Sequence, residues 1–520
     1  MWLYADIKTL GDIPRHYART TPQQTALVDG AGQVSYSRLD KLTNQIARAV
    51  IGEAIPLKSH IGYLGKNSSR YFEALFGVNK AGCALAPLNW RLAAPELALV
   101  IADAQCPLVF ADIEFEANIK TVQALCTHPF RIVLLDPTRQ ASTEFDAWVA
   151  AQTSSDPHIE VEPWQTALLI YTSGTTGKPK GVQLSHQGLS YMRLCEHLEP
   201  ALQWQEGDVM MLVMPNFHLV GSGLSVQCLY NGHTLSILPM LDAGQLLKVI
   251  ARDRPNICAL VPTAIQMLLD HPDAKNADFS SLRLVMYAGS PISSRLLQRA
   301  LVEMGCQFMQ FYGATESSGA ITLLRPEQHV LDDEAKLKSC GTPLPLIDIK
   351  VVDSTGNEVP NGGVGELLVR SPSLFTGYWN QPEATAAALK DGWYRTGDAG
   401  RKDEAGLFYL VDRVKDMIVS GGENVYSAEV EQVLLKHPKV KLCAVIGLPD
   451  EKWGEKVVAV IVPADGHTAT PEEIIAHCRT LIAGYKLPKM VAFAESLPMT
   501  ATGKVLKRTV REQFLSESAA

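Results

Sequence analysis

One loop, rich in glycine and in hydroxyl side chains, sets the narrowest limits on the fold of this 520-residue chain. Residues 166–171 have the apolar pattern of a buried strand, and residues 171–182 read Tyr-Thr-Ser-Gly-Thr-Thr-Gly-Lys-Pro-Lys-Gly-Val. Helical spacing resumes at Leu184. A strand, a polar loop and a helix in this order are typical of ligand-binding α/β folds. The pattern therefore predicts a layered α/β protein in which this loop holds a ligand.

The residue types of the loop favour a polyphosphate ligand. Glycines let backbone N–H groups approach an anion, hydroxyls donate further hydrogen bonds, and lysines offset negative charge. The spacing is not the G-x-x-x-x-G-K-[ST] of P-loop enzymes, because no glycine stands five residues before Gly177, and a kinase or GTPase is disfavoured. The alternative is a flexible polar surface loop. The candidate nucleotide-binding residues are Thr172, Ser173, Gly174, Thr175, Thr176, Gly177, Lys178 and Lys180.

The charge balance and the cysteines exclude several classes of protein. The chain carries 47 basic and 55 acidic side chains, a formal net charge of −8, which leaves no electrostatic footprint for nucleic acid. Its ten cysteines lack paired C-x-x-C spacing, so neither a disulfide framework nor a zinc site is indicated. Asp6 and Lys8 come too early for the apolar core of a signal peptide, and no apolar run reaches spanning length. We expect a cytoplasmic protein without a transmembrane segment.

The length exceeds what one hydrophobic core supports, which predicts a large body and a smaller domain. Helical and β-rich patterns alternate in the N-terminal part, and two later strands each end in a turn of small residues, so we expect their tips to share one crevice. After residue 345 the pattern alternates, which predicts an antiparallel sheet or small barrel ending near Asp412. Beyond Asp412 we expect a helix capped by Ser427, then strands and a helix. The expected segments are 36–49, 108–111, 132–135, 282–287, 308–312, 347–352, 365–369, 443–446, 457–462 and 474–482.

Five further motifs follow the loop in order along the chain: Tyr312-Gly-Ala-Thr-Glu-Ser317, Tyr394-Arg-Thr-Gly-Asp398, Asp412-Arg-Val-Lys-Asp416, Ser420-Gly-Gly-Glu-Asn-Val-Tyr426 and Thr502-Gly-Lys504. Together with it they resemble the adenylate-forming superfamily of acyl-CoA synthetases, firefly-type luciferases and adenylation domains of peptide synthetases. The resemblance covers nearly the whole chain and implies a domain at 1–411, built of layered α/β subdomains with a small β-barrel-like subdomain, and a small mobile α+β domain at 412–520.

These motifs supply candidate ligands for a nucleotide and for Mg²⁺. An aromatic residue beside glycine can lie against adenine, and Glu316 offers the oxygen ligand that Mg²⁺ prefers. The resemblance implies that Glu316 and Thr172 hold the metal and are catalytic, that Asp398 binds the ribose, and that Arg413 is its partner on the nucleotide. Taken alone, Glu316 would be a solvated surface acid and Asp398 a turn residue. The remaining nucleotide-binding candidates are Gly289, Ser290, Pro291, Tyr312, Gly313 and Thr315.

The segment 214–223 is apolar and resembles the acyl-pocket motif of the superfamily. A lone histidine among apolar residues is more often a satisfied core residue than a catalyst, so we expect His218 to line or gate the pocket. The predicted walls carry no obvious lysine or arginine, which favours a hydrophobic acid. The predicted acyl-pocket residues are Phe217, His218, Gly221, Thr263, Gly289, Gly313 and Ala314.

The last motifs imply two chemical steps. Lys504 resembles the lysine that contacts both the carboxylate and the α-phosphate during adenylation, and a compact ammonium suits charge developing there. Gly421, Gly422 and Glu423 resemble the loop that shapes the path of the thiol. Asp412 matches the hinge position, with a capping or ion-pair residue as the alternative. We expect rotation at Asp412 to exchange the two loops.

The expected activity is the ATP-dependent joining of a carboxylic acid to coenzyme A through an acyl-adenylate, with Mg²⁺ bound. A medium- or long-chain fatty acid is the expected substrate, and an aryl or steroid-derived acid is the second choice. The alternatives are an enzyme that loads a carrier protein, a luciferase-like oxygenase and a non-enzymatic nucleotide or acyl sensor. The sensor is disfavoured because Lys504, Glu316 and Asp398 are all present. We expect a monomer or homodimer, and an apolar substrate is compatible with peripheral membrane contact.

Overall fold

The structure is a computed structural model that describes residues 6–172, 179–289, 292–331, 333–420, 423–499 and 505–518. It divides into two compact units, Met1–Asp348 with Val369–Tyr394 and Ile349–Leu368 with Arg395–Ala520, called here the first and the second unit. The predicted boundary at residue 412 separates the N-terminal domain from a domain that is expected to move, and it stays a prediction. Within the described residues, no helix combines the length and the apolar character needed to cross a bilayer.

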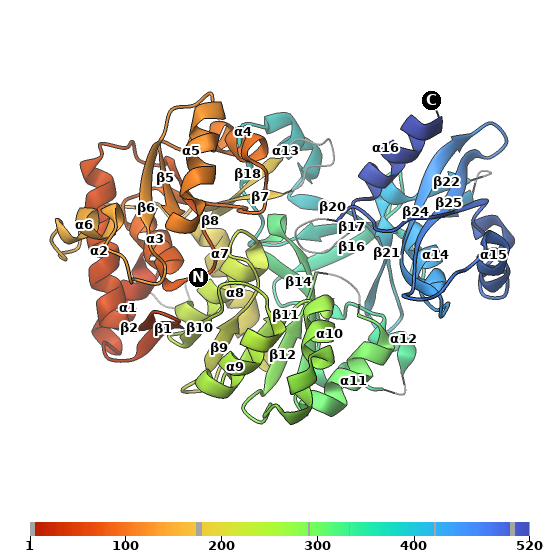
Figure 1. Cartoon of the computed structure of the whole chain (residues 1–520), viewed down its shortest axis with the longest axis horizontal. Helices are drawn as coiled ribbons and strands as arrows, with labels where there is room; N and C mark the ends of the chain where they lie inside the picture. The colour runs from red at the N-terminus through yellow and green to blue at the C-terminus, as the bar shows by residue number, and fades with distance from the viewer. Residues whose placement is uncertain are drawn as a thin grey trace. The chain divides into compact units, whose positions relative to one another are not determined.

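A seven-stranded sheet forms one half of the first unit, in the order β18-β8-β7-β4-β3-β5-β6 (Figure 1). Strands β3 to β7 are parallel where they pair, and their near-continuous apolar runs are typical of strands covered on both faces. The bounds are β3 His60–Leu64, β4 Ala84–Leu88, β5 Leu108–Asp112, β6 Arg131–Leu135, β7 Thr166–Thr172, β8 Lys180–Ser185 and β18 Gly377–Tyr378, with helices α2 Tyr36–Gly52, α3 Ser69–Lys80, α4 Ala94–Ala104, α5 Glu116–Leu125, α6 Glu144–Ala150 and α13 Pro382–Ala388.

A nine-stranded sheet forms the other half of the first unit, in the order β15-β14-β13-β12-β11-β9-β10-β1-β2. Helices α3 and α7 contact strands of both sheets, so they lie between them (Figure 1). The bounds are β1 Thr25–Asp29, β2 Gly32–Ser35, β9 Val209–Leu212, β10 Thr234–Ile237, β11 Ile257–Leu260, β12 Leu284–Tyr287, β13 Gln307–Ala314, β14 Gly319–Leu324 and β15 Thr342–Pro343, with helices α1 Asp12–Thr20, α7 His186–His197, α8 Leu219–Tyr230, α9 Ala243–Asp253, α10 Pro262–Asp270, α11 Ser294–Met304 and α12 Glu334–Leu337.

Two five-stranded sheets complete the chain. One has the order β16-β17-β20-β19 with β21 paired to β20, and the other has the order β23-β22-β25-β24 with β26 paired to β25. Helices α14 and α16 pack on β24, and the apolar sides of α14 and α15 meet the same core. The bounds are β16 Asp348–Val352, β17 Gly365–Arg370, β19 Leu389–Lys390, β20 Trp393–Lys402, β21 Phe408–Arg413, β22 Ile418–Ser420, β23 Glu423–Val425, β24 Val440–Asp450, β25 Gly454–Pro463 and β26 Met490–Phe493, with helices α14 Ser427–Leu434, α15 Pro471–Arg479 and α16 Lys507–Ser518.

The predicted α/β class is confirmed, and three local expectations are corrected. The loop after β7 leads into a second strand, β8, and not directly into a helix, because Val182 and Leu184 are buried with period two. Helix α7 begins only after Ser185, whose hydroxyl accepts the N–H of Gly188. The two later strands whose tips were expected to meet, β12 and β13, are parallel neighbours in the nine-stranded sheet, whereas β7 and β8, which flank the glycine-rich loop, belong to the seven-stranded one.

The second and third corrections concern helices α14 and α15. Ser427 is the first residue of α14 and not its N-cap, and the capping position is held by Tyr426, whose side chain makes no capping hydrogen bond. The Ser427 hydroxyl instead donates to the carboxylate of Asp412. The next predicted helix, at 474–482, ends earlier than expected, because α15 stops at Arg479.

Candidate active site

Glu316 lies next to strand β8, which follows the loop predicted to bind phosphate. It lies in the short turn Thr315–Ser317 after β13, and its Oε1 accepts the hydroxyl of Tyr378 at 2.8 Å. The Nζ of Lys180 lies 4.6 Å from the centre of the Tyr378 ring, and Lys180 pairs with Thr172 across β7 and β8. The structure thus brings Lys180, the cross-strand partner of Thr172, near Glu316 through one tyrosine.

Tyr378 is a functional candidate that the sequence patterns did not single out. Burial, together with the negative charge of Glu316, raises the pKa of Tyr378 well above its usual value. The phenol therefore stays protonated and donates its hydrogen bond to the carboxylate. Tyr378 and Glu316 are 62 residues apart in the chain, so no local signal could have paired them. The local sequence around Tyr378 is a short apolar run, which indicates burial but not a partner for the hydroxyl.

The backbone around Glu316 is fixed by a distant segment. Phe375 donates its N–H to the carbonyl of Glu316 at 2.8 Å. The hydroxyl of Ser373 donates to the carbonyl of Ser317 at 3.0 Å, and that of Ser318 donates to the carbonyl of Ser373 at 2.6 Å. All three serines are fully buried, where an unmade hydrogen bond is costly. The carboxylate of Glu316 is therefore presented by a rigid turn.

Other predicted nucleotide-binding residues lie at the ends of two neighbouring strands. Strands β12 and β13 are parallel, with Tyr287 opposite Gln310, so Gly289 and Tyr312 follow at the same edge of the sheet. A side chain at Gly313 would overlap the carbonyl oxygen of Gly319, so only glycine fits this crossing of β13 and β14. The candidates Ala314 and Thr315 come next in the chain, half-buried.

The predicted acyl segment has a buried aromatic anchor. Phe217 is buried, and its ring centre lies 4.5 Å from that of His218 and 6.3 Å from that of Trp90. Gly221 packs so tightly in α8 that a Cβ would overlap the carbonyl of Pro215. Among the remaining predicted wall residues, Thr263 is exposed at the start of α10.

Two asparagines that the sequence patterns did not single out support this segment. The amide of Asn67 donates to the carbonyls of Met214 at 3.0 Å and Leu238 at 3.1 Å. Its Oδ1 accepts the N–H of Asn216 at 2.8 Å. Asn67 and Asn216 are both buried, so these bonds fix the backbone on which Phe217 and His218 stand.

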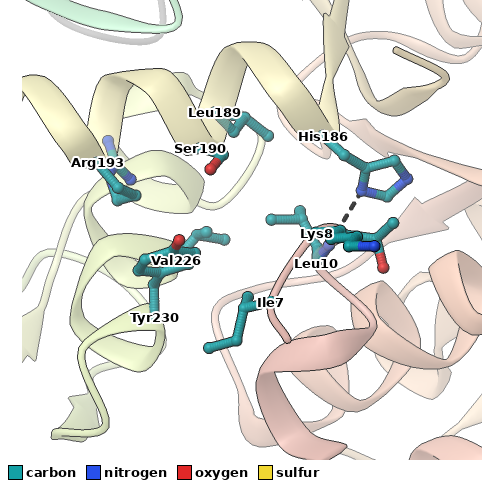
Figure 2. Close-up of a pocket in the computed structure, with 10 residues that line it drawn as sticks. Ile7, Lys8, Leu10, His186, Leu189, Ser190, Arg193, Val226 and Tyr230 are labelled. Atoms are coloured by element: carbon teal, nitrogen blue, oxygen red, sulfur yellow. Dashed lines mark hydrogen bonds between the residues drawn. The ribbon is translucent and has the colours of Figure 1, made fainter. Parts of the chain in front are cut away.

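An enclosed cavity elsewhere in the first unit is too small for any of the predicted substrates. It measures about 10 Å³ and lies between the segment 7–10 and helices α7 and α8 (Figure 2). Such a volume holds about one water molecule. In its wall the Nδ1 of His186 accepts the N–H of Leu10 at 3.0 Å, as Figure 2 shows. Burial lowers the pKa of His186 to about 4, so the ring is neutral and its proton sits on Nε2.

The predicted ribose-binding pair is preformed in the second unit. Asp398 and Arg413 stand opposite each other in β20 and β21, and the Nε of Arg413 lies 2.8 Å from the Oδ1 of Asp398. Asp398 is buried, and its N–H is received by the hydroxyl of Thr396 at 3.0 Å. Arg413 also donates to the carbonyl of Thr396 at 3.3 Å and is exposed at its tip. The oxygens of a carboxylate can accept hydrogen bonds from hydroxyl groups.

Asp412, the predicted hinge, makes tertiary contacts in the second unit. Its Oδ2 accepts the hydroxyl of Ser427 at 2.6 Å and the N–H of Ala428 at 3.2 Å. It therefore caps α14, the role that the sequence left open as the alternative. Several predicted site residues lie outside the described residues: Ser173, Gly174, Thr175, Thr176, Gly177, Lys178, Ser290, Pro291, Gly421, Gly422, Lys504 and the side chain of Glu423.

The donor set fits a magnesium ion held mainly by a nucleotide. Glu316 is a carboxylate presented by a rigid turn, and Thr172 offers a hydroxyl. Among the described residues, no group of three His, Cys, Asp or Glu side chains could form a cage for a metal. Mg²⁺ is commonly held by one or two carboxylates together with phosphate oxygens and water, so one protein carboxylate suffices here.

Comparison with known proteins identifies the family. The AMP-binding enzyme family matches residues 14–379, and the AMP-binding enzyme C-terminal domain matches residues 429–504. The fatty acid–[acyl-carrier-protein] ligase ScoC of Streptomyces coeruleorubidus is 36% identical over 519 residues, covering 99% of this chain and 98% of that protein. The feruloyl-CoA synthase of an Amycolatopsis species is 37% identical over 506 residues, covering 97% of this chain and 99% of that protein.

A solved structure agrees with these matches. The Mycobacterium tuberculosis fatty acyl CoA synthetase superimposes with a TM-score of 0.79 at 30% identity, covering 99% of this chain and 100% of that chain. The chain therefore belongs to the AMP-binding enzyme family, and it is an adenylate-forming acid ligase. The predicted superfamily is confirmed.

Proposed function

We propose that the chain is an acyl-CoA synthetase, which turns a carboxylic acid, ATP and coenzyme A into an acyl-CoA, AMP and pyrophosphate. The observation that carries the proposal is the Glu316 carboxylate, held by Tyr378 beside Lys180 and Thr172 at the ends of the glycine-rich loop. A fixed carboxylate next to cationic and hydroxyl donors suits magnesium-bound phosphates.

In the first step a carboxylate oxygen of the acid attacks the α-phosphorus of ATP, and the bond to pyrophosphate breaks. The product is a mixed anhydride of the acid with AMP. Glu316 and Thr172 would hold Mg²⁺, which offsets phosphate charge when bound. Lys180 adds a cation at the mouth of the loop, and Lys504 would meet the developing charge at the α-phosphate. Positioning and charge stabilisation are sufficient, so no protein nucleophile is required.

In the second step the thiol of coenzyme A attacks the acyl carbon, the thiol loses its proton, and AMP leaves with the electron pair of the broken C–O bond. The proposal includes a rotation at Asp412 that replaces the Lys504 loop with the segment 421–423. Asp398 and Arg413 would hold the ribose through both steps. Their mutual ion pair orients the carboxylate before the nucleotide arrives.

A medium- or long-chain fatty acid is the proposed substrate. The predicted acyl segment is apolar and is anchored by buried Phe217, which supports a hydrophobic acid. The names of two relatives, a fatty acid ligase and a fatty acyl CoA synthetase, agree with this choice. An aryl acid is the second candidate, because the rings of Trp90 and Phe217 meet edge to face and a relative is named a feruloyl-CoA synthase.

A direct product assay tests the proposal. Purified protein is given MgATP, coenzyme A and a panel of fatty, aryl and steroid-derived acids, and thioesters are detected by mass spectrometry. A parallel reaction replaces coenzyme A with a phosphopantetheinylated carrier protein, because one relative is named an acyl-carrier-protein ligase. We expect acyl-CoA from fatty acids. Acyl transfer to the carrier alone would contradict coenzyme A as the acceptor.

A further inference from the structure

The C-terminal helix α16 carries two cations on one face, and both make tertiary contacts within the second unit. Lys507 and Arg511 are four residues apart, which places them one above the other on the helix. The Nζ of Lys507 lies 2.7 Å from the hydroxyl of Ser427 and 2.8 Å from the Oε1 of Glu431. The Nη2 of Arg511 lies 2.9 Å from the Oε1 of Glu455. Helix α16 is therefore tied to two different segments.

The Lys507 contact reaches the predicted hinge. The Ser427 hydroxyl accepts from Lys507 and donates to the Oδ2 of Asp412 at 2.6 Å, so a single side chain links the helix to the hinge residue. Glu431 also accepts the N–H of Val445 at 2.7 Å. The side chains of Lys507 and Glu431 are 17% and 16% exposed, so this ion pair is screened far less than a surface pair.

The same lysine stands next to the loop that contains Lys504. Met499 and Val505 form an isolated antiparallel bridge, and the N–H of Leu506 donates to the carbonyl of Pro498 at 2.8 Å. These contacts close the base of the loop on both sides. Lys507 follows directly and anchors that base to α14. Lys507 is therefore placed to fix the base of the Lys504 loop relative to the hinge residue Asp412.

The Arg511 contact reaches the other predicted reaction loop. Glu455 receives Arg511 on Oε1 and the N–H of Val419 on Oε2, the latter at 3.0 Å. Val419 lies in β22, two residues before Gly421, and its neighbour Ser420 pairs with Gly454 of β25. Arg511 therefore orients the acid that fixes the strand leading into the predicted thiolation loop. Its side chain is 41% exposed, so this tie is weaker than that of Lys507.

We propose that α16 carries two positioning residues, each of which supports a different step. Lys507 supports acyl-adenylate formation, and Arg511 supports transfer to the thiol. The proposal rests on the proposed function, because it assigns each cation to one of its two steps. Lys507 acts on the first step through Ser427, Asp412 and the base of the Lys504 loop. Arg511 acts on the second step through Glu455 and β22.

The experiment measures both steps separately in full-length variants. Acid-dependent exchange of labelled pyrophosphate into ATP reports the first step, and acyl-CoA release from supplied acyl-adenylate reports the second. We expect Lys507→Met to slow the first step about tenfold and to leave the second within about twofold. Arg511→Met should slow the second step about threefold and spare the first. Lys507→Arg keeps the charge and should restore most of the first step.

The matched control is Arg508→Met. Arg508 lies on the same helix and pairs with Glu512 at 2.7 Å, but both side chains are 56% exposed and face no other element through this pair. It should change neither step. Equal losses of both steps in Lys507→Met and Arg511→Met, or no loss in either, would overturn the proposal. An inactive wild-type protein would instead contradict the proposed function itself, so the two failures are distinguishable.

Discussion

The carboxylate of Asp412 and the hydroxyl of Ser427 form a 2.6 Å hydrogen bond at the N-terminus of α14. The same carboxylate oxygen accepts the N–H of Ala428, and the other oxygen accepts the N–H of Arg413. Asp412 thus lies next to the last residue of strand β21 and supplies negative charge to a helix N-terminus, where it is favourable. A rotation about residue 412 would therefore act on the same residue that caps α14.

The first prediction is that Asp412→Ala destabilises the second unit by about 1 kcal/mol, because the orphan N–H groups of α14 lose their acceptor. The measurement is the free energy of unfolding from a denaturant titration, followed by circular dichroism. Asp465→Ala is the control, since the side chain of Asp465 is exposed and its carboxylate pairs with Lys441. Equal stability of the Asp412 variant and the control would contradict the capping role.

The second prediction concerns the hydrogen bond between Tyr378 and Glu316. Tyr378→Phe should slow pyrophosphate exchange about tenfold and raise the magnesium concentration needed for half-maximal rate, because the carboxylate loses the donor that orients it. Tyr409→Phe removes a comparable bond, from a tyrosine hydroxyl to Asp403 at 2.9 Å, and should leave exchange unchanged. If both tyrosine variants exchanged at the wild-type rate, the orienting role would be refuted.

The third prediction tests the close approach of β13 and β14. Gly313→Ala should weaken ATP binding at least tenfold, since the new Cβ overlaps the carbonyl of Gly319 and forces the strands apart. Binding is measured by calorimetry with a non-hydrolysable ATP analogue. Gly30→Ala is the control, because nothing lies within 4 Å of a Cβ at that position. Unaltered affinity in Gly313→Ala would show that the strands accommodate the methyl group.

The fourth prediction is an acid sensitivity that depends on His186. Burial lowers its pKa from 6.5 to about 4, so its contribution to stability is complete above 6.5 and is lost as the pH falls toward 4. Between about pH 7.5 and about pH 5 this loss is about 2 kcal/mol. His186→Asn keeps an acceptor for the N–H of Leu10 and cannot titrate. Unfolding free energies at both pH values should therefore show a smaller decline in the variant, and parallel declines would disprove the assignment.

Local patterns predicted the elements whose core-facing residues repeat regularly. Helix α2, strands β5 and β6, and the pair β12 and β13 lie where their apolar spacing placed them. Strand β8 was missed because only Val182 and Leu184 carry the period-two signal, next to a loop that resembles a helix-preceding turn. The cap on α14 was assigned to Ser427, the residue type that favours caps, whereas the acceptor comes from Asp412 on another strand.

The motifs indicated candidate residues for the site, but they did not predict the contacts that hold these residues in place. Asp398 and Arg413 belong to separate motifs, and their cross-strand ion pair follows from the register of β20 and β21. Tyr378 reaches Glu316 across 62 residues, and Asn67 reaches Asn216 across 149. Such supporting contacts depend on how sheets and helices pack, for which a single sequence carries no local signature.

Acid-dependent exchange of labelled pyrophosphate into ATP tests the central claim most directly, because it requires the acyl-adenylate and nothing later. With magnesium present, the wild-type protein should exchange label when given a fatty acid and should not exchange without one. Lys504→Ala should lose exchange and still convert supplied acyl-adenylate with coenzyme A. If the wild-type protein exchanged no label with any acid of a broad panel, the account of this chain as an adenylate-forming ligase would be contradicted.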